Sequence, residues 1–158
     1  MSVVAAFVLS CALPLAILAG APLPHGPSAP YVEGADARAD IRLALDEAAR
    51  RHQSVIVIFG ANWCPDCKLL DSALKAGPSA RLVARDFRIV KVDVGAFDRN
   101  TEIAAGYGVP IKNGIPAMVV LSPRGEVRYA TRLGELSEAR EIGEDGIYQL
   151  LRSALKSR

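Results

Sequence analysis

An α/β domain with a mixed central sheet is the fold class that this sequence predicts, and three observations predict it. Short apolar runs rich in β-branched residues alternate with segments of helical periodicity, which gives the order β-α-β-α-β-β-α after one additional N-terminal helix. A helix joins the first two expected strands, which makes them parallel, and a tight turn joins the last two, which makes them antiparallel. The length of 158 residues fits one such domain and an export segment.

The composition is that of an ordinary globular protein. Hydrophobic residues make up 51% of the chain and charged residues 23%. The 19 basic and 17 acidic residues leave a formal net charge of +2, and no basic run with interleaved aromatic residues occurs. We therefore expect no nucleic-acid partner.

The N-terminal segment predicts export. The first 21 residues carry no charged side chain, residues 3–19 are almost wholly apolar, and small residues precede a potential cleavage point after Ala21. No Lys or Arg precedes the apolar run and Pro22 follows the potential cut, so an uncleaved anchor formed by residues 3–19 remains a second interpretation. We expect residues 1–21 to be a signal peptide or N-terminal anchor of a periplasmic or otherwise exported protein, with membrane contact only if the segment is retained.

The domain itself is expected to begin with a helix that leads into a buried strand. Residues 22–35 are rich in proline and glycine without periodicity, which is typical of a linker, so we place the domain at 36–158. Asp36 is a suitable N-cap for a helix to about Arg51, because apolar residues recur every three or four positions after it. The apolar run 55–59 then predicts a short buried strand.

Periodicity and breaker residues predict the next elements. Residues 65–76 carry apolar residues at helical spacing, and Gly77-Pro78 is expected to end that helix. Residues 87–94 are rich in β-branched residues and predict the second strand. A short helix is expected over 100–106.

A hairpin and a helix are expected to complete the fold. Strands at 117–121 and 126–131 flank a four-residue segment with favourable turn chemistry, Ser122-Pro123-Arg124-Gly125. From about Asp145 onward, one apolar stripe at helical spacing predicts the closing helix.

The chemistry of the chain is expected at Trp63-Cys64-Pro65-Asp66-Cys67, directly after the first buried strand. A helix N-terminus presents free backbone N–H groups and a positive dipole end, and both favour a thiolate. The thiolate is the reactive form of cysteine, so we expect Cys64 to be an accessible, ionised nucleophile with Cys67 in disulfide reach. Pro65 suits the first helical position, where its missing N–H would have had no intrahelical partner. This pattern predicts thiol–disulfide exchange.

A structural disulfide or half of a zinc site are the alternatives for the cysteine pair. Zinc normally takes four ligands, and the only histidines are His25 in the linker and His52 at a helix end. A static disulfide that closes so short a loop would stabilise the fold little. We therefore expect neither a metal nor an organic cofactor.

The order of elements, with the cysteine motif after the first core strand, Tyr107-Gly108-Val109 further on and Ile115-Pro116 before the third strand, resembles the thioredoxin-like superfamily over about residues 36–156. Trp-Cys-x-x-Cys follows the first core strand and Ile115-Pro116 precedes the third. The resemblance is carried by three segments, Gly60-Ala61-Asn62-Trp63-Cys64-Pro65-Asp66-Cys67, Tyr107-Gly108-Val109 and Gly114-Ile115-Pro116-Ala117. The chain is similar to small exported members of the family and to the periplasmic C-terminal domain of the membrane thiol:disulfide interchange protein.

The resemblance implies a role for each matching residue. Cys64 would be the nucleophile and Cys67 the resolving thiol. Pro116 would be a cis-proline beside the two sulfurs, and the backbone of Ile115 would pair with an extended substrate segment. Trp63 would either face the substrate or pack beside the strand. The implied partners are protein thiols and disulfides, together with an upstream thiol donor such as an inner-membrane protein.

The sequence departs from the family pattern at three places. Many thioredoxins carry a buried Asp six residues before the first Cys, and that position is Ile58 here. A water molecule, Asp66 or another carboxylate must then accept the proton of the resolving thiol, or exchange is slower. The loop at 110–113 is an insertion next to the expected site, where it can shape substrate choice. A second, polar insertion at 132–144 has no assigned role.

The dipeptide Pro65-Asp66 between the cysteines is expected to tune the redox potential. A carboxylate at Asp66 opposes a neighbouring thiolate, which raises the thiol pKa and makes the pair a better reductant, although a first-turn carboxylate also simply favours the helix. We therefore expect a reductase or isomerase rather than an oxidase. The alternative from another class is a peptide-binding or chaperone module that uses the edge at Pro116 and has a non-catalytic cysteine pair.

Overall fold

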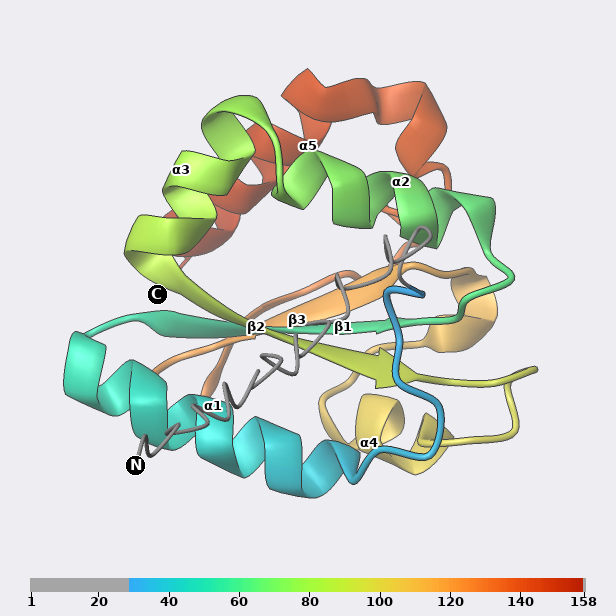
Figure 1. Ribbon diagram of the computed structural model, residues 1–158, viewed down its shortest axis with the longest axis horizontal. Coiled ribbons are helices and arrows are strands. Elements are labelled where there is room, and N and C mark those ends of the chain that lie inside the picture. Colours follow the sequence, from blue (N-terminus) through green and yellow to red (C-terminus); the bar gives the residue numbers. More distant parts are fainter. Residues whose placement is uncertain (1–28, 158) are drawn as a thin grey trace, which may run out of the picture.

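The sheet lies at the centre of the molecule, between two layers of helices (Figure 1). The computed structural model describes residues 29–157, so the predicted leader and the first half of the predicted linker, residues 22–28, lie outside the described residues. The sheet has the order β2-β1-β3-β4, formed by β1 (Ser54–Gly60), β2 (Phe87–Asp93), β3 (Ala117–Leu121) and β4 (Val127–Ala130). β1 is parallel to β2, and β3 and β4 form an antiparallel hairpin, both as predicted. β1 is also antiparallel to β3, which was not predicted.

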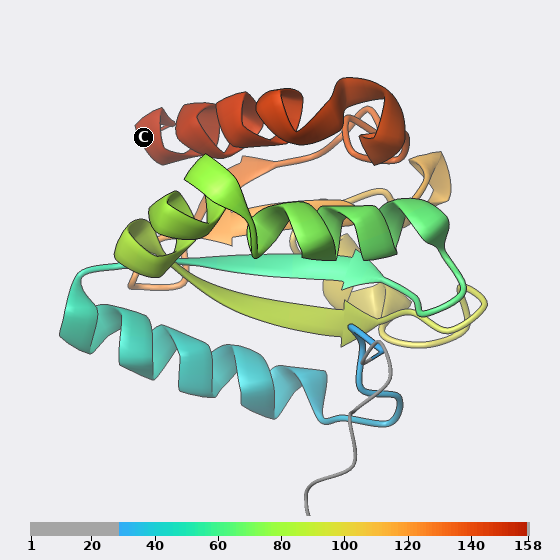
Figure 2. The same cartoon turned by 45° about the horizontal axis from the view of Figure 1, so that its top comes forward.

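Helices cover both faces of the sheet (Figures 1 and 2). One face is covered by α2 (Pro65–Leu74), α3 (Gly77–Asp86) and α5 (Ala139–Lys156), and the other by α1 (Ala37–Arg51) and α4 (Thr101–Gly106). A 3₁₀ helix, η1 (Ile111–Asn113), precedes β3. The arrangement confirms the predicted α/β fold class.

β1 is the centre of the core, because helices cover it from both sides. All seven of its residues are buried. Val55, Val57 and Phe59 belong to the hydrophobic cluster that includes α1 and α4. Ile56 and Ile58 belong to the cluster that includes α2, α3 and α5. The alternation follows the two-residue period of a strand, and burial of both faces explains the continuous apolar run.

Helix α3 was not predicted from the sequence. The dipeptide Gly77-Pro78 was expected only to end the helix that begins at Pro65. In the structure α2 ends at Leu74, and α3 begins at Gly77 with Pro78 in its first turn. A proline there loses no hydrogen bond, because the first N–H groups of a helix have no intrahelical partner. The same dipeptide therefore begins a second helix instead of leading into a loop.

Helix α5 begins earlier than predicted, inside the polar insertion. It starts at Ala139, and Gly143 interrupts it with the non-helical angles φ 62° and ψ −177°. Leu136 and Ala139 are buried in the cluster beneath α2 and α5. The segment 132–144 is thus a packed part of the domain that leads into the closing helix.

Candidate active site

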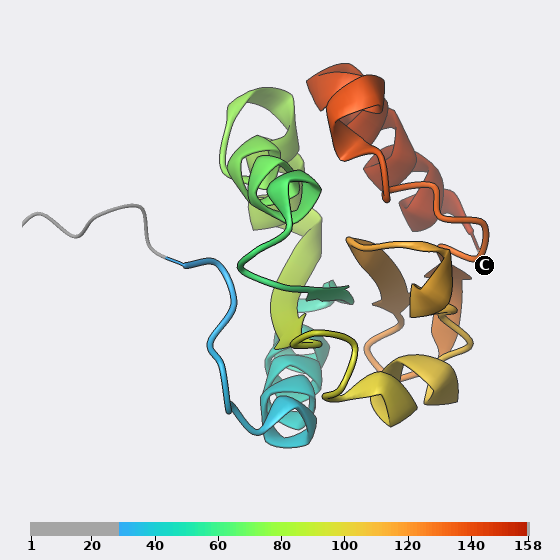
Figure 3. The ribbon, with the colours of Figure 1, turned by 90° about the vertical axis from the view of Figure 1, so that its right-hand side faces the viewer.

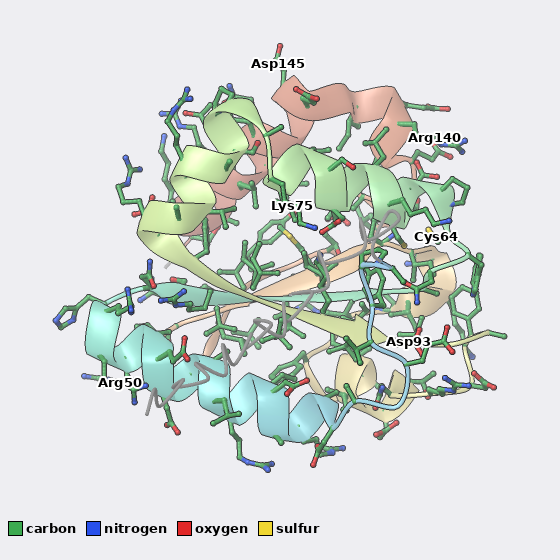
Figure 4. All side chains as sticks on the ribbon, viewed as in Figure 1. Arg50, Cys64, Lys75, Asp93, Arg140 and Asp145 are labelled. Carbon is green, nitrogen blue, oxygen red and sulfur yellow. The ribbon has the colours of Figure 1, made fainter. Side chains whose placement is uncertain are left out.

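Cys64 is the N-cap residue of α2, at the end of the molecule where β1 passes into that helix (Figure 4). Its backbone is extended, with φ −79° and ψ 117°, and its Sγ accepts a hydrogen bond of 3.2 Å from the backbone N–H of Cys67. Pro65 follows as the first helical residue. The cysteine therefore takes the position of a capping Ser or Asp, and a negative charge on its sulfur is favoured there.

The pKa of Cys64 is lowered to about 7. The largest cause is the hydrogen bond that the Cys67 thiol donates to its sulfur, and the backbone N–H groups of Cys67 and Asp66 lower it further. Burial and the charge of the Asp66 carboxylate act in the opposite direction. Cys64 is therefore substantially ionised at neutral pH, as a nucleophilic thiol requires.

Cys67 is the protonated member of the pair. Its hydrogen bond to Cys64 and its burial raise the pKa of its thiol far above the ordinary value. A backbone hydrogen bond from Ala61 and an interaction with the side chain of Tyr31 lower that pKa in part. Both cysteines are free thiols. The two sulfurs thus have different tasks, an attacking thiolate and a thiol that must still lose its proton.

Access to the nucleophile is narrower than predicted from the sequence. Cys64 is only 3% exposed and Cys67 1% exposed. The reason is that the loop at Ile115 covers the sulfur of Cys64: as a thiol, Cys64 donates a hydrogen bond of 3.5 Å to the carbonyl oxygen of Ile115. A partner disulfide must therefore reach the small exposed edge of the Cys64 sulfur.

The peptide bond between Ile115 and Pro116 is cis, as predicted. Both residues are buried, and the bond lies immediately before β3, the neighbour of β1 in the sheet. The structure therefore brings the predicted Ile115–Pro116 loop against the sulfur of Cys64.

Trp63 lies on the surface beside the cysteines and is 56% exposed. Its Nε1 donates a hydrogen bond of 2.8 Å to the carbonyl oxygen of Gly95, and its ring makes an edge-to-face contact with Phe97, with the centroids 5.9 Å apart. Phe97 also lines an apolar groove that continues over α4 and η1. Of the two expected roles for Trp63, the exposed position favours contact with a partner over packing in the core.

Asp66 is paired with Arg140. Its Oδ1 accepts hydrogen bonds of 3.0 Å from both the backbone N–H and Nε of Arg140, at the start of α5. The Asp66 carboxylate is 9% exposed, whereas the Arg140 side chain is 63% exposed. Figure 4 shows Cys64 and Arg140 at the same end of the molecule. The cation therefore offsets part of the charge that Asp66 places next to Cys64.

The two insertions contact each other beside this site. Asn113, from the first insertion, donates a hydrogen bond of 2.8 Å from Nδ2 to the carbonyl oxygen of Arg132, at the start of the second. Arg132 in turn donates from its guanidinium to the carbonyl oxygen of Gly108. Arg132 also lines the apolar groove together with η1. The two insertions are thus joined to each other by hydrogen bonds. The second insertion also contacts the cysteine motif, through the hydrogen bonds from Arg140 to Asp66.

Tyr31 is a residue of the site that sequence reasoning missed, because it lies in a segment interpreted as linker. It is 2% exposed, and its hydroxyl lies next to Cys67. Asn62 binds its backbone from both sides: Tyr31 N–H donates to Asn62 Oδ1 at 3.0 Å, and Asn62 Nδ2 donates to the Tyr31 carbonyl oxygen at 2.9 Å. The signal that could have revealed it is a lone aromatic residue among prolines and glycines, since an aromatic side chain in such a segment favours packing against the domain.

Residues 29–157, the part of the chain that the structure describes, contain neither a candidate metal site nor a helix that could span a membrane. Within this range no three His, Cys, Asp or Glu side chains are grouped so that they can hold a metal ion. None of the helices in the same range has the length and apolar character to cross a membrane.

The fold and site define a class of protein. The family model described as Thioredoxin-like matches residues 36–123, more than half of the chain. The chain belongs to the thioredoxin-like family.

Its relatives include enzymes of thiol–disulfide chemistry. A disulphide isomerase from Xylella fastidiosa has a similar structure, with a TM-score of 0.76 and 45% identity over 80% of this chain and 96% of that chain. The thiol:disulfide interchange protein DsbD of Pseudomonas fluorescens is 29% identical over 96 residues, which are 60% of this chain and 16% of that much longer protein. The C-terminal domain of DsbD from Neisseria meningitidis shares the fold, with a TM-score of 0.53 at 21% identity, over 77% of this chain and 96% of that domain. The homologues confirm the class of enzyme expected from the cysteine pair, a thiol-disulfide oxidoreductase.

Proposed function

We propose that this protein is an exported reductase or isomerase that exchanges disulfides with protein substrates through Cys64 and Cys67. The observation that carries the proposal is the position of Cys64, an N-cap thiol with a pKa of about 7 that receives hydrogen bonds from Cys67. The thiolate attacks one sulfur of a partner disulfide and forms a mixed disulfide. Cys67 then attacks Cys64, which releases the reduced partner and leaves Cys64 and Cys67 joined.

The pKa of Cys64 supports the reducing direction. In this fold the first cysteine of a reductant has a pKa of about 7, and that of a strong oxidant about 3.5, because a very stable thiolate favours the reduced enzyme. Cys64 belongs with the reductants, and the Asp66 carboxylate contributes by raising its pKa. Equilibration with thiol buffers measures the redox potential. We expect a redox potential of about −270 mV, whereas a redox potential of about −120 mV would contradict the reducing direction.

The surface around Cys64 supports a protein substrate. Trp63 and Phe97 are both exposed, and an apolar groove leads from Phe97 to Arg132. We propose that an extended segment of the partner lies here and against the loop at Ile115 and Pro116. An upstream thiol protein must return electrons to the pair, and we propose that this donor is an inner-membrane protein.

A trapping experiment tests the exchange. In a Cys67→Ala variant the second step is blocked, so mixed disulfides on Cys64 should accumulate and be released by a thiol reductant. The matched control replaces both cysteines with Ala and should trap nothing. A peptide-binding module with a non-catalytic cysteine pair would instead capture the same partners in both variants, without a covalent bond.

Export is tested by the mature N-terminus. Cell fractionation followed by N-terminal sequencing distinguishes a protein cut after Ala21 from one that keeps residues 3–19 as an anchor. The charge-free N-terminal segment supports export in both cases. A full-length chain in the cytoplasmic fraction would contradict it.

A further inference from the structure

The hydroxyl of Tyr31 is a buried polar group that the exchange reaction above does not use. It lies in the same tight space as the sulfur of Cys67. A Cβ atom added to Gly60 would overlap the phenolic oxygen of Tyr31 and would come within 2.8 Å of Cys67 Sγ. Buried hydroxyl groups normally have a hydrogen-bond partner. Cys67 Sγ is the polar atom that faces this hydroxyl from α2.

Two features hold the hydroxyl in this position. Asn62 pairs with the backbone N–H and C=O of Tyr31 through hydrogen bonds of 3.0 and 2.9 Å, which hold the segment before α1 against the loop that leads into α2. Figure 3 shows that segment running past the loop that leads into α2. Gly60 leaves the space in which the hydroxyl and the sulfur meet. The backbone hydrogen bonds to Asn62 and the absence of a side chain at Gly60 therefore fix the contact between the Tyr31 hydroxyl and Cys67 Sγ.

The second step of exchange needs such a group. Cys67 must become a thiolate in order to attack Cys64, yet burial and the neighbouring sulfur raise the pKa of its thiol. The position from which many thioredoxins supply a carboxylate is occupied by Ile58, which packs in the apolar cluster of α2 and α5. The interaction with Tyr31 lowers the pKa of Cys67, and burial raises that of the phenol well above its ordinary value. The tyrosine thus keeps its proton and acts as a donor.

We propose, on the basis of the function above, that Tyr31 is a catalytic residue of the resolving step, in which its O–H donates a hydrogen bond to Cys67 Sγ as that sulfur becomes a thiolate. The proton of Cys67 passes to solvent. The electron pair on Cys67 Sγ forms the bond to Cys64 Sγ, and the bond from Cys64 to the partner sulfur breaks. The partner leaves as a thiolate, which takes a proton from water. Two electrons pass from the dithiol to the partner, and Tyr31 is unchanged.

The test uses a chromogenic aromatic disulfide whose thiolate absorbs visible light. The reduced full-length protein releases one coloured thiolate when Cys64 attacks and a second when Cys67 resolves the mixed disulfide, so the two steps are separate kinetic phases. We expect Tyr31→Phe to slow the second phase about tenfold or more, as for loss of a hydrogen bond to a charged group, and to leave the first phase within about twofold. The matched control is Tyr107→Phe, which removes a hydroxyl from the half-buried tyrosine that follows α4 and should leave both phases unchanged.

The outcomes separate the two proposals. Two phases in the wild type with an unchanged second phase in Tyr31→Phe would overturn the role of Tyr31 and leave the exchange function intact. Equal slowing of both phases would also overturn it, because the variant would then disturb the site as a whole. A wild type that releases no second thiolate contradicts the exchange function itself. Asn62→Ala is the second variant, to be used if Tyr31→Phe does not fold. It keeps the Tyr31 hydroxyl but removes the two hydrogen bonds that hold the Tyr31 backbone, so we expect a slower second phase in this variant also.

Discussion

Two segments far apart in the sequence contact the same four-residue motif, and they act on different ends of it. The segment before α1 places the neutral hydroxyl of Tyr31 against Cys67. The segment 132–144, which includes the start of α5, places the cation of Arg140 on Asp66, two residues after Cys64. One contact is sealed from solvent, since Tyr31 is 2% exposed. The other is open on one side, since the Arg140 side chain is 63% exposed.

The difference teaches how one motif can be tuned at two points. An attacking thiolate has to be ionised before the partner arrives, so long-range charge on Asp66 and Arg140 affects it. A resolving thiol is protonated until the moment of attack, so a hydrogen bond donated directly to its own sulfur is the effective control. The ion pair is subject to salt screening because its cation is in solvent, whereas the buried hydroxyl is not. Each segment should therefore affect one chemical step and spare the other.

The largest expected effect is the loss of stability when Leu136, the buried residue that packs the second segment against the core, is truncated. Leu136 is 1% exposed in the cluster beneath α2 and α5, four residues before Arg140. Leu136→Ala should lower the free energy of unfolding by about 2–5 kcal/mol, because it removes buried methyl groups and leaves a cavity. It should also loosen Arg140 from Asp66 and so raise the pKa of Cys64. Urea unfolding and the pH dependence of Cys64 alkylation measure the two effects.

Leu133 offers a matched control in the same segment. Its side chain is 86% exposed, so Leu133→Ala should change stability by less than about 0.5 kcal/mol. Equal losses in the two variants would show that the segment is not packed as described.

Gly60 gives the corresponding test on the side of Tyr31. In Gly60→Ala the new methyl group would overlap the Tyr31 oxygen and crowd Cys67 Sγ. We expect stability to fall by about 1–3 kcal/mol, as for other overpacked interiors, and the resolving step to slow while the attack by Cys64 does not. Gly106→Ala is the control, because it lies in α4 with open space around its Cβ position and should be neutral or slightly stabilising. A tolerated methyl at Gly60 would argue against close contact between Tyr31 and Cys67.

Most of the fold was predictable because it rests on local patterns. A few neighbouring residues are enough to predict an element in three places: the apolar run at 54–60, the turn at 122–125 and the capping residue Asp36. The cysteine pair was predictable for the same reason, since a helix N-terminus directly follows a buried strand. Helix α3 was missed because Gly77-Pro78 has the same local signature whether one helix ends or another begins.

The rest of the site depends on contacts between distant residues, which local patterns do not contain. Tyr31 and Asn62 are 31 positions apart, and Asp66 and Arg140 are 74 apart. Nothing in the spacing of either pair indicates contact. The sequence allowed two interpretations of Asp66, a charge that tunes the thiol pKa and a carboxylate that favours its own helix. The structure adds a contact that neither includes, the hydrogen bonds from Arg140 in the first turn of α5. Composition also concealed Tyr31, because prolines and glycines surround it in a segment without periodicity.

Replacement of Arg140 is expected to have a smaller effect on stability than the changes at Leu136 and Gly60. In Arg140→Met the backbone N–H still binds Asp66, but the cation is lost, so we expect a stability loss of about 1 kcal/mol or less. The Asp66 carboxylate, which raises the pKa of Cys64, would then be less well neutralised. The midpoint of Cys64 alkylation should move above pH 7, with less thiolate at any lower pH. Arg152→Met, on the same helix but facing Tyr148, should leave the midpoint in place.

The smallest effect is expected from Asp66→Asn, and its sign is opposite. The amide oxygen can still accept the N–H of Arg140, so the helix contact survives, while the negative charge beside Cys64 disappears. The pKa of Cys64 should fall, the alkylation midpoint should move below pH 7, and the redox potential should become more oxidising. High salt should shrink the shift. If Asp66→Asn and Arg140→Met moved the midpoint in the same direction, Asp66 would act as a helix cap alone, and charge at this position would not control the attacking sulfur.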